Sequence, residues 1–253
     1  MKIHNVQQNT PEWEYLRAGM PTASAFDRIV TPTGKLSKQS RDYKAWLLAE
    51  RVMRKPIETK KTSWMDRGTE FESEAVEFLE GVLEVKTERI GFVTNDSCTI
   101  GASPDRWVGN DRQAEIKVPA PQTHMGYLIA AEELPAIALR YQQAATDMRR
   151  SLSDRTFTPP SKAEIGEVKK EFDEALARTI QGEYKIQTAG QLWITERTGA
   201  ILLSYSPEGL PPVFFHLKRD EDFIRILGQA VSEFSRDLEE SAADLVKRGI
   251  IQP

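Results

Sequence analysis

The chain has 253 residues, of which 40% are hydrophobic and 28% charged, and this composition is that of a soluble globular protein with one large domain. No apolar run reaches the roughly 18 residues that span a membrane, and the N-terminus lacks the apolar core of a signal peptide. One cysteine, Cys98, excludes an internal disulfide, and three scattered histidines give no zinc cluster. A cytoplasmic protein is expected. The net charge of −4 argues mildly against a nucleic-acid partner, which would have to be bound by a local basic surface.

Two short helices are predicted near the N-terminus. Thr10 is suited to an N-cap with Pro11 as the first helical residue, and the helix carries Trp13 and Arg17. A second helix begins around Pro21–Ser24. A serine at a helix start beside an arginine can bind an anion, although an ordinary N-cap and a surface arginine explain the same residues.

A basic stretch follows, with nine Lys and Arg against three Asp and Glu between residues 35 and 61. It is either a solvated helix face or a wall that faces DNA. Helices are predicted over residues 39–54 and 65–82, where apolar residues recur at helical spacing. Tyr43, Leu47 and Val52 mark the apolar side of the first.

The most informative stretch is the hairpin predicted after strands at about 86–94 and 97–102. Gly109 to Asp111 is a turn signal, and the strand that follows alternates polar and apolar residues. Glu115 and Lys117 therefore leave the same face of the sheet, and the turn brings Asp105 close to Glu115.

Two carboxylates and an ammonium on one face suit metal-assisted cleavage of a phosphodiester. Mg²⁺ prefers carboxylate oxygens, it neutralises charge on the transferring phosphoryl group, and Lys117 could orient the attacking water. Glu-x-Lys by itself is common on solvated strands, so the three residues alone do not decide the function.

Residues 135–182 are predicted to form an inserted helical hairpin, broken near Pro159. A separate helix is expected before it, over residues 122–131. Beyond it, two strands at about 199–205 and 212–218 lead into a long terminal helix whose inward residues include Phe223, Ile226 and Phe234. The hairpin is either a packed appendage or a contact for DNA, another subunit or a partner.

Four separate patterns resemble one known family in the order in which they occur. They are Trp-x-x-x-Arg followed by Thr-Ala-Ser, Gly-x-x-x-Glu, Ser-Pro-Asp followed by Glu-x-Lys, and Tyr-x-x-Gln. Together they resemble the lambda exonuclease / YqaJ-like viral recombinase family of PD-(D/E)xK nucleases. The chain departs from the family after Asp105, where Arg106 and Trp107 replace the usual glycine.

The resemblance implies a mixed α/β fold of the restriction-endonuclease type, with a central mixed sheet flanked by helices. It implies a Mg²⁺-dependent 5′→3′ exonuclease that degrades one strand of linear double-stranded DNA and leaves a 3′ overhang, with Mn²⁺ as a substitute metal. A single-strand-annealing recombinase is the implied partner, a homotrimeric ring is known in the family, and the gene would belong to a phage or prophage in a bacterial host.

The resemblance also assigns roles to individual residues. The catalytic residues would be Asp105, Glu115 and Lys117, and the metal ligands would be Glu72, Asp105, Glu115 and the Ile116 carbonyl. The terminal or scissile phosphate would be surrounded by Arg17, Ser24, Ser103 and Gln187, with Gln191 as the competing choice of active-site glutamine.

Alternative functions remain at this stage. One is an endonuclease of the same superfamily, and another is a Cas4-like exonuclease, which the lack of a cysteine set disfavours. A third is a protein that binds DNA ends in recombination and has lost catalysis, which the intact acidic set disfavours.

Overall fold

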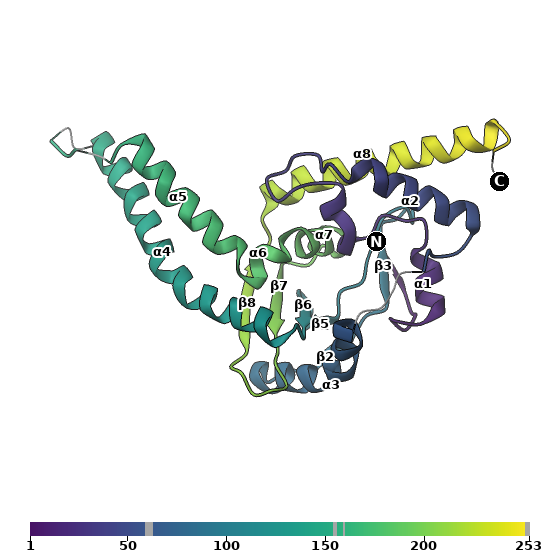
Figure 1. The fold of residues 1–253 in the computed structure, drawn as a ribbon, viewed down its shortest axis with the longest axis horizontal. Coiled ribbons are helices and arrows are strands. Elements are labelled where there is room, and N and C mark those ends of the chain that lie inside the picture. Colours follow the sequence, from purple (N-terminus) through teal and green to yellow (C-terminus); the bar gives the residue numbers. More distant parts are fainter. Residues whose placement is uncertain (59–62, 154–155, 159, 251–253) are drawn as a thin grey trace.

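The computed structural model describes residues 1–58, 63–153, 156–158 and 160–250 as two sheets surrounded by helices (Figure 1). The smaller sheet has the strand order β1-β3-β4, with β1 at Lys2–His4, β3 at Phe92–Thr94 and β4 at Gly101–Ala102. The larger sheet has the order β2-β5-β6-β7-β8, with bounds Thr87–Arg89, Arg106–Val108, Arg112–Lys117, Gly199–Ser204 and Val213–Lys218.

The larger sheet is mixed because β6 and β7 run parallel while its other neighbouring strands are antiparallel. Helix α3 (Ser63–Leu83) covers one face, where Ala75 and Leu79 pack against Ala114 and Ile116 of β6. Helix α7 (Lys185–Thr195) lies on the other side of the sheet in Figure 1. The two helices place the central strands β6 and β7 in the middle of a layered core, as the predicted fold class requires.

The remaining helices pack around this centre. The N-terminal half contributes α1 (Pro11–Arg17), the 3₁₀ helix η1 (Ala23–Arg28) and α2 (Ser40–Met53). The C-terminal half contributes α4, α5, α6 and α8, with bounds Pro121–Ser153, Lys162–Ala177, Ile180–Glu183 and Glu221–Lys247. Among the described helices, none is long and apolar enough to cross a membrane.

Capping residues mark the starts of α1 and α8, and the sequence predicts the first of them. The Thr10 hydroxyl accepts a hydrogen bond from the Trp13 N–H, with Pro11 at the first position of α1. Asp220 caps α8 in the same way through the Phe223 N–H. In both helices the residues between the capping side chain and the N–H that it accepts from are helical, so these two boundaries follow from local chemistry.

Several predicted details are wrong. Residues 97–100 do not form a strand, because Asn95 closes a turn by accepting from the Thr99 and Ile100 N–H groups, and Cys98 has a left-handed φ of 57°. The helix expected to start near Pro21 is the 3₁₀ helix η1. Two apolar residues expected to face inward, Val52 and Ile226, are 48% and 38% exposed.

Helices α4 and α5 pack side by side and project from the body (Figure 1). Their contact includes a stacked pair of rings, Tyr141 and Phe172, with centroids 5.5 Å apart. The separate helix expected at 122–131 does not exist, because α4 continues through Pro135 as one helix. Near the body the pair is anchored by Ile180, which is fully buried beside β7. That residues 135–182 are an insertion stays a prediction.

Candidate active site

The β5–β6 hairpin brings the predicted acidic residues together. Its turn contains Gly109 at a φ of 58°, which favours glycine, and its register places Arg106 opposite Ala114. Asp105 directly precedes β5 and so lies beside β6 one pair further on. Its Oδ2 accepts a hydrogen bond of 2.7 Å from the Ile116 N–H. The predicted proximity of Asp105 to the Glu-x-Lys strand is therefore present.

Glu115 and Lys117 leave the same face of β6, as their spacing predicts. The Lys117 Nζ lies 2.6 Å from the Glu115 Oε1. Glu115 is only 1% exposed, whereas Lys117 is half-buried, so the polar face is covered by protein at one end and open at the other. A buried carboxylate of this kind requires several donors, since it would otherwise be costly to desolvate.

Helix α7 supplies those donors. Gln187 Nε2 donates to Glu115 Oε1 at 2.5 Å, and Gln191 Nε2 donates to Glu115 Oε2 at 2.6 Å. The two glutamines are four residues apart and therefore share one face of the helix. The sequence left them as competing candidates, and the structure places both on Glu115. Gln191 is buried and Gln187 is half-buried.

A cavity of about 390 Å³ opens beside these residues. Its walls include Asp105, Ile116 and Lys117 from the hairpin, Glu72 from α3, and Tyr184 before α7. The Glu72 carboxylate also lies 3.8 Å from the guanidinium groups of two arginines, Arg89 and Arg106. Glu72 thus reaches the same cavity as the hairpin, although its nearest ionic partners are arginines.

The donor set fits a hard divalent cation. Tyr205 N–H donates to the Lys117 carbonyl, which therefore faces β7. Alternation along a strand turns the Ile116 carbonyl the opposite way, to the side on which Asp105 lies. A carboxylate and a backbone carbonyl thus face one space beside Glu115, and such oxygens are the ligands of Mg²⁺. Among the described residues, no three acidic, histidine or cysteine side chains gather closely enough to form a metal site unaided.

The charges of the hairpin perturb one another. Burial, followed by the neighbouring charge of Glu115, raises the pKa of Asp105 to about 8. Burial opposes the charge on Lys117, but Glu115 and Asp105 together raise the pKa of that ammonium above its ordinary value. Two acidic side chains are therefore held close to one ammonium, which pairs with Glu115. A bound cation would relieve the repulsion that the single ammonium leaves.

Three of the predicted phosphate-contacting residues, Arg17, Ser24 and Ser103, form a second cluster around Trp13. The Arg17 guanidinium stacks 3.8 Å from the centre of the Trp13 ring and donates to Ser24 Oγ at 3.1 Å. The Trp13 Nε1 donates to Ser103 Oγ at 3.0 Å. Since Ser103 is two residues before Asp105, this cluster adjoins the hairpin along the chain. The sequence placed Trp13 on the helix but did not show that its ring joins the other three.

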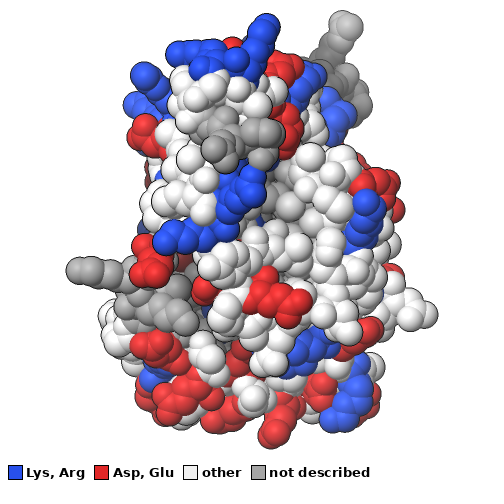
Figure 2. Space-filling view, turned by 90° about the vertical axis from the view of Figure 1, so that its right-hand side faces the viewer, with Lys and Arg blue, Asp and Glu red and all other residues white. Residues whose placement is uncertain are grey.

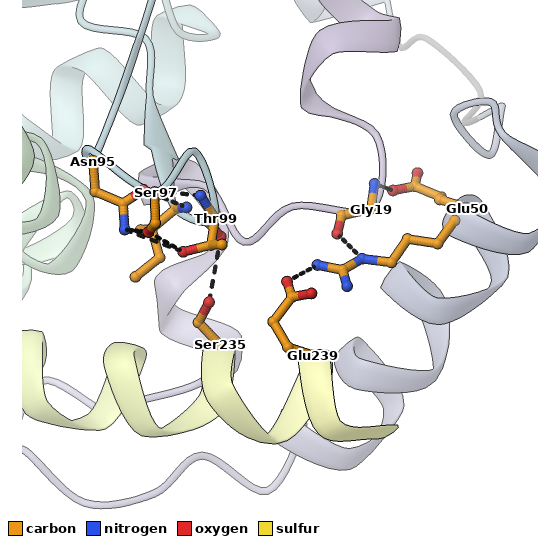
Figure 3. Close-up of polar contacts among 9 residues, drawn as sticks. Gly19, Glu50, Asn95, Ser97, Thr99, Ser235 and Glu239 are labelled. Carbon is orange, nitrogen blue, oxygen red and sulfur yellow. Dashed lines mark hydrogen bonds and ion pairs between the residues drawn. The ribbon is translucent and has the colours of Figure 1, made fainter. Parts of the chain in front are cut away.

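The turn after Arg17 is fixed by α2 and α8 (Figure 3). Glu50 accepts from the Gly19 N–H at 2.8 Å, and Arg51 donates to the Gly19 carbonyl at 2.7 Å. Arg51 also pairs with Glu239 of α8 at 2.6 Å. Gly19 has a φ of 73°, and a Cβ there would lie 2.5 Å from Arg51, so a glycine is needed at this contact.

The basic stretch at residues 35–61 is partly neutralised by contacts within the protein. Two of its cations, Lys44 and Arg51, pair with acidic residues of α8. Residues 59–61 of the stretch lie outside the described residues. Figure 2 shows Lys and Arg toward the top of one face, where Figure 1 places α2 and α8, and mainly Asp and Glu at its bottom. A DNA-facing wall stays a prediction.

Tyr184 lines the cavity, but no role was predicted for it from the sequence. The Lys117 Nζ lies 4.8 Å from the centre of its ring, which is a cation–π contact. Tyr184 precedes Gln187 by three residues and so belongs to the Tyr-x-x-Gln pattern. The pattern could have identified Tyr184 as a site residue, but it was used only to predict the role of Gln187.

Comparison with known proteins decides the family. The model of the YqaJ-like viral recombinase domain matches residues 12–198. The chain belongs to this family. The matched region contains both clusters described above, from Trp13 to Gln191. No curated protein matches the chain in sequence.

Solved structures of other proteins have the same fold as this YqaJ-like protein. An alkaline exonuclease, LHK-Exo, from Laribacter hongkongensis is 22% identical, with a TM-score of 0.66 over 95% of this chain and 98% of that one. The same enzyme in complex with dAMP matches equally well. A phage-related exonuclease from Haemophilus somnus is 12% identical, with a TM-score of 0.58 over 89% and 96% of the two chains. The predicted family and fold class are confirmed, and the prediction that the chain is a nuclease is supported.

Proposed function

We propose that this protein is a Mg²⁺-dependent 5′→3′ exonuclease that digests one strand of linear double-stranded DNA and leaves a 3′ overhang. The observation that carries the proposal is the hairpin on which Asp105, Glu115 and Lys117 meet beside a cavity. The adjoining Arg17 cluster supports action at a DNA end, because a half-buried guanidinium with two hydroxyl groups suits a phosphate.

Each residue of the hairpin has a role in this proposal. Asp105, Glu115 and the Ile116 carbonyl would hold the metal, and Glu72 would complete the site from α3. When bound, Mg²⁺ supplies neutralisation of charge on the phosphoryl oxygens and lowers the pKa of a water. Lys117 stays protonated beside the two carboxylates, so it orients the attacking water and favours its deprotonation as a fixed positive charge.

The direction of digestion rests on the Arg17 cluster. Each cut by an enzyme that moves 5′→3′ creates a new 5′-phosphate, so a pocket for that group serves both end selection and forward movement. Arg17, Ser24 and Ser103 would form the pocket, with Gln187 between it and the metal site. LHK-Exo has been crystallised with dAMP, a mononucleotide of the kind that such an enzyme would release.

The proposal extends to partners and conditions. Mn²⁺ would substitute for Mg²⁺, since both accept carboxylate and carbonyl ligands. A single-strand-annealing recombinase would use the 3′ overhang, and a homotrimeric ring would enclose the duplex.

End-labelled linear duplex tests the function directly. With Mg²⁺ we expect label at the 5′ end to be released first and label at the 3′ end to be retained, and with EDTA no release. Glu115→Gln serves as the inactive control. Cleavage of a closed circular plasmid at a similar rate would instead identify an endonuclease, and no Mg²⁺-dependent release at all would leave a protein that only binds ends.

A further inference from the structure

Gln113 is a buried polar residue that no motif of this chain uses. It lies on β6 two residues before Glu115, so both side chains leave the same face of the strand. Its exposed fraction is 0%, and it sits beneath α7 with Glu115. A fully buried amide must satisfy both of its ends, and its partners therefore show what it does.

Those partners form a chain of hydrogen bonds that ends on Glu115. The Thr195 hydroxyl lies 3.0 Å from Gln113 Oε1, and Gln113 Nε2 donates to Gln191 Oε1 at 3.0 Å. Gln191 Nε2 then donates to Glu115 Oε2 at 2.6 Å. Thr195 is four residues after Gln191, so one face of α7 supplies both ends of the contact with Gln113.

The chain can run in only one direction. An ionised carboxylate accepts hydrogen bonds and cannot donate them, so Gln191 must turn its Nε2 toward Glu115. Its Oε1 then faces Gln113, which must in turn present its own Nε2. Gln113 Oε1 is left facing the Thr195 hydroxyl, whose single proton it shares with the Gln191 backbone carbonyl. Gln113 thus holds the Gln191 carbonyl oxygen and reinforces the orientation in which Gln191 Nε2 donates to the carboxylate.

We propose that Gln113 is a positioning residue that acts through Gln191 on the Glu115 carboxylate. This rests on the proposed function in one respect, that Glu115 is a metal ligand. Partners in the outer shell of a metal site fix the orientation of the ligand, and their loss typically costs about 10- to 100-fold in metal affinity or activity. Gln113 would contribute on that scale without touching metal or DNA.

Two variants of Gln113 test the proposal in opposite ways. Gln113→Met keeps the length of the side chain but removes both polar ends, so Gln191 Oε1 loses its donor and the amide is held only by its contact with Glu115. Gln113→Glu keeps the shape but offers only acceptors, so Gln191 Nε2 is drawn away from Glu115. We expect Mn²⁺ binding, followed by electron paramagnetic resonance without DNA, to weaken by about 10-fold or more in Gln113→Met and further in Gln113→Glu.

Thr188→Val is the matched control. Thr188 is also buried on α7, but its hydroxyl has no hydrogen-bond partner among the residues that the structure describes, so this variant removes a buried polar atom without touching the chain to Glu115. It should bind Mn²⁺ as the wild type does.

Both Gln113 variants should lower kcat, while KM for DNA and binding of DNA ends in EDTA stay within about twofold of wild type.

The outcomes separate this inference from the proposed function. Wild-type affinity for Mn²⁺ in a folded Gln113→Met protein, with Glu115→Gln binding poorly, would overturn the role of Gln113 and leave the metal site intact. Equal Mn²⁺ binding by wild type and Glu115→Gln would remove the metal site, and the inference with it. If Gln113→Glu fails to fold, Gln113→Met decides the question.

Discussion

Replacement of Arg17 by alanine should erase a preference for 5′-phosphorylated DNA ends. Arg17 is half-buried, and its contacts among the described residues are with the Trp13 ring and the hydroxyls of Thr22 and Ser24, none of which is a carboxylate. Burial lowers the pKa of Arg17 to about 10, so the guanidinium remains charged at the pH of an assay near 8. A partly buried cation without an anionic partner is costly, and a phosphate dianion would supply the opposite charge.

The magnitude follows from the contacts that the phosphate would make. Hydrogen bonds to charged groups contribute about 1.5–3 kcal/mol, and each 1.4 kcal/mol corresponds to about a tenfold change. The wild type should therefore digest 5′-phosphorylated duplex about 10- to 150-fold faster than 5′-hydroxyl duplex. Arg17→Lys should keep part of this ratio, because lysine retains the charge but lacks the planar fork.

Initial rates on two duplexes that differ only at the 5′ terminus measure the ratio. Arg17→Ala should bring it close to one by slowing the phosphorylated substrate. Arg225→Ala, which removes an exposed arginine of α8, controls for the general loss of a positive charge. Equal wild-type rates on the two ends would refute the end pocket and leave the metal site unaffected.

Three further predictions concern the active site and the projecting helices. Asp105→Asn, Glu115→Gln and Lys117→Met should each lower cleavage by more than about 100-fold, while circular dichroism shows a folded protein; near-normal turnover of any one would remove it from the site. Replacement of residues 142–170 by a short Gly/Ser linker should keep cleavage of short duplexes, because the buried Ile180 and the Tyr141–Phe172 stack remain; a soluble but inactive product would show that these helices complete the site. Asp105 has a pKa in the folded protein of about 8, above its ordinary value of 3.8, so folding stability in EDTA should fall as the pH rises from about 4 to about 8. The melting temperature should follow this slope in wild type and less in Asp105→Asn, and Mg²⁺ should stabilise more at pH 8.5 than at pH 6; identical profiles for the two proteins would contradict the raised pKa.

The hairpin was predictable from the sequence because its determinants are local. Alternation fixed which residues share a face of β6, and the Gly109 turn fixed the return of the chain. The N-cap of α1 at Thr10 was equally local. The burial of Glu115 was not predictable in this way, because its donors are 72 and 76 residues further along the chain. Only the resemblance to a family connected Gln187 with the hairpin.

The errors have physical reasons that the sequence pattern could not weigh. At Cys98 a turn replaces the expected strand, since the Asn95 side chain bonds to the backbone ahead of it, and Figure 3 shows this turn beside α8. The sequence pattern predicts a helix start at Pro135, but a helix can continue through a proline where other contacts hold it. Here α4 continues and packs against α5, and that tertiary packing outweighs the local preference.

Helix α7 connects the two candidate sites mechanically. On one side it carries Gln187 and Gln191, which hold Glu115. Near them Gly190 faces η1, the helix that carries Ser24, and a Cβ at Gly190 would lie only 2.5 Å from a ring carbon of the buried Phe26. The absence of a side chain therefore sets how closely η1 approaches α7. If Ser24 holds the terminal phosphate and Glu115 the metal, this contact fixes the separation between the DNA end and the bond that is cut. Because the separation is set by close packing within the core, and not by a flexible loop, each cut would fall at a constant distance from the end.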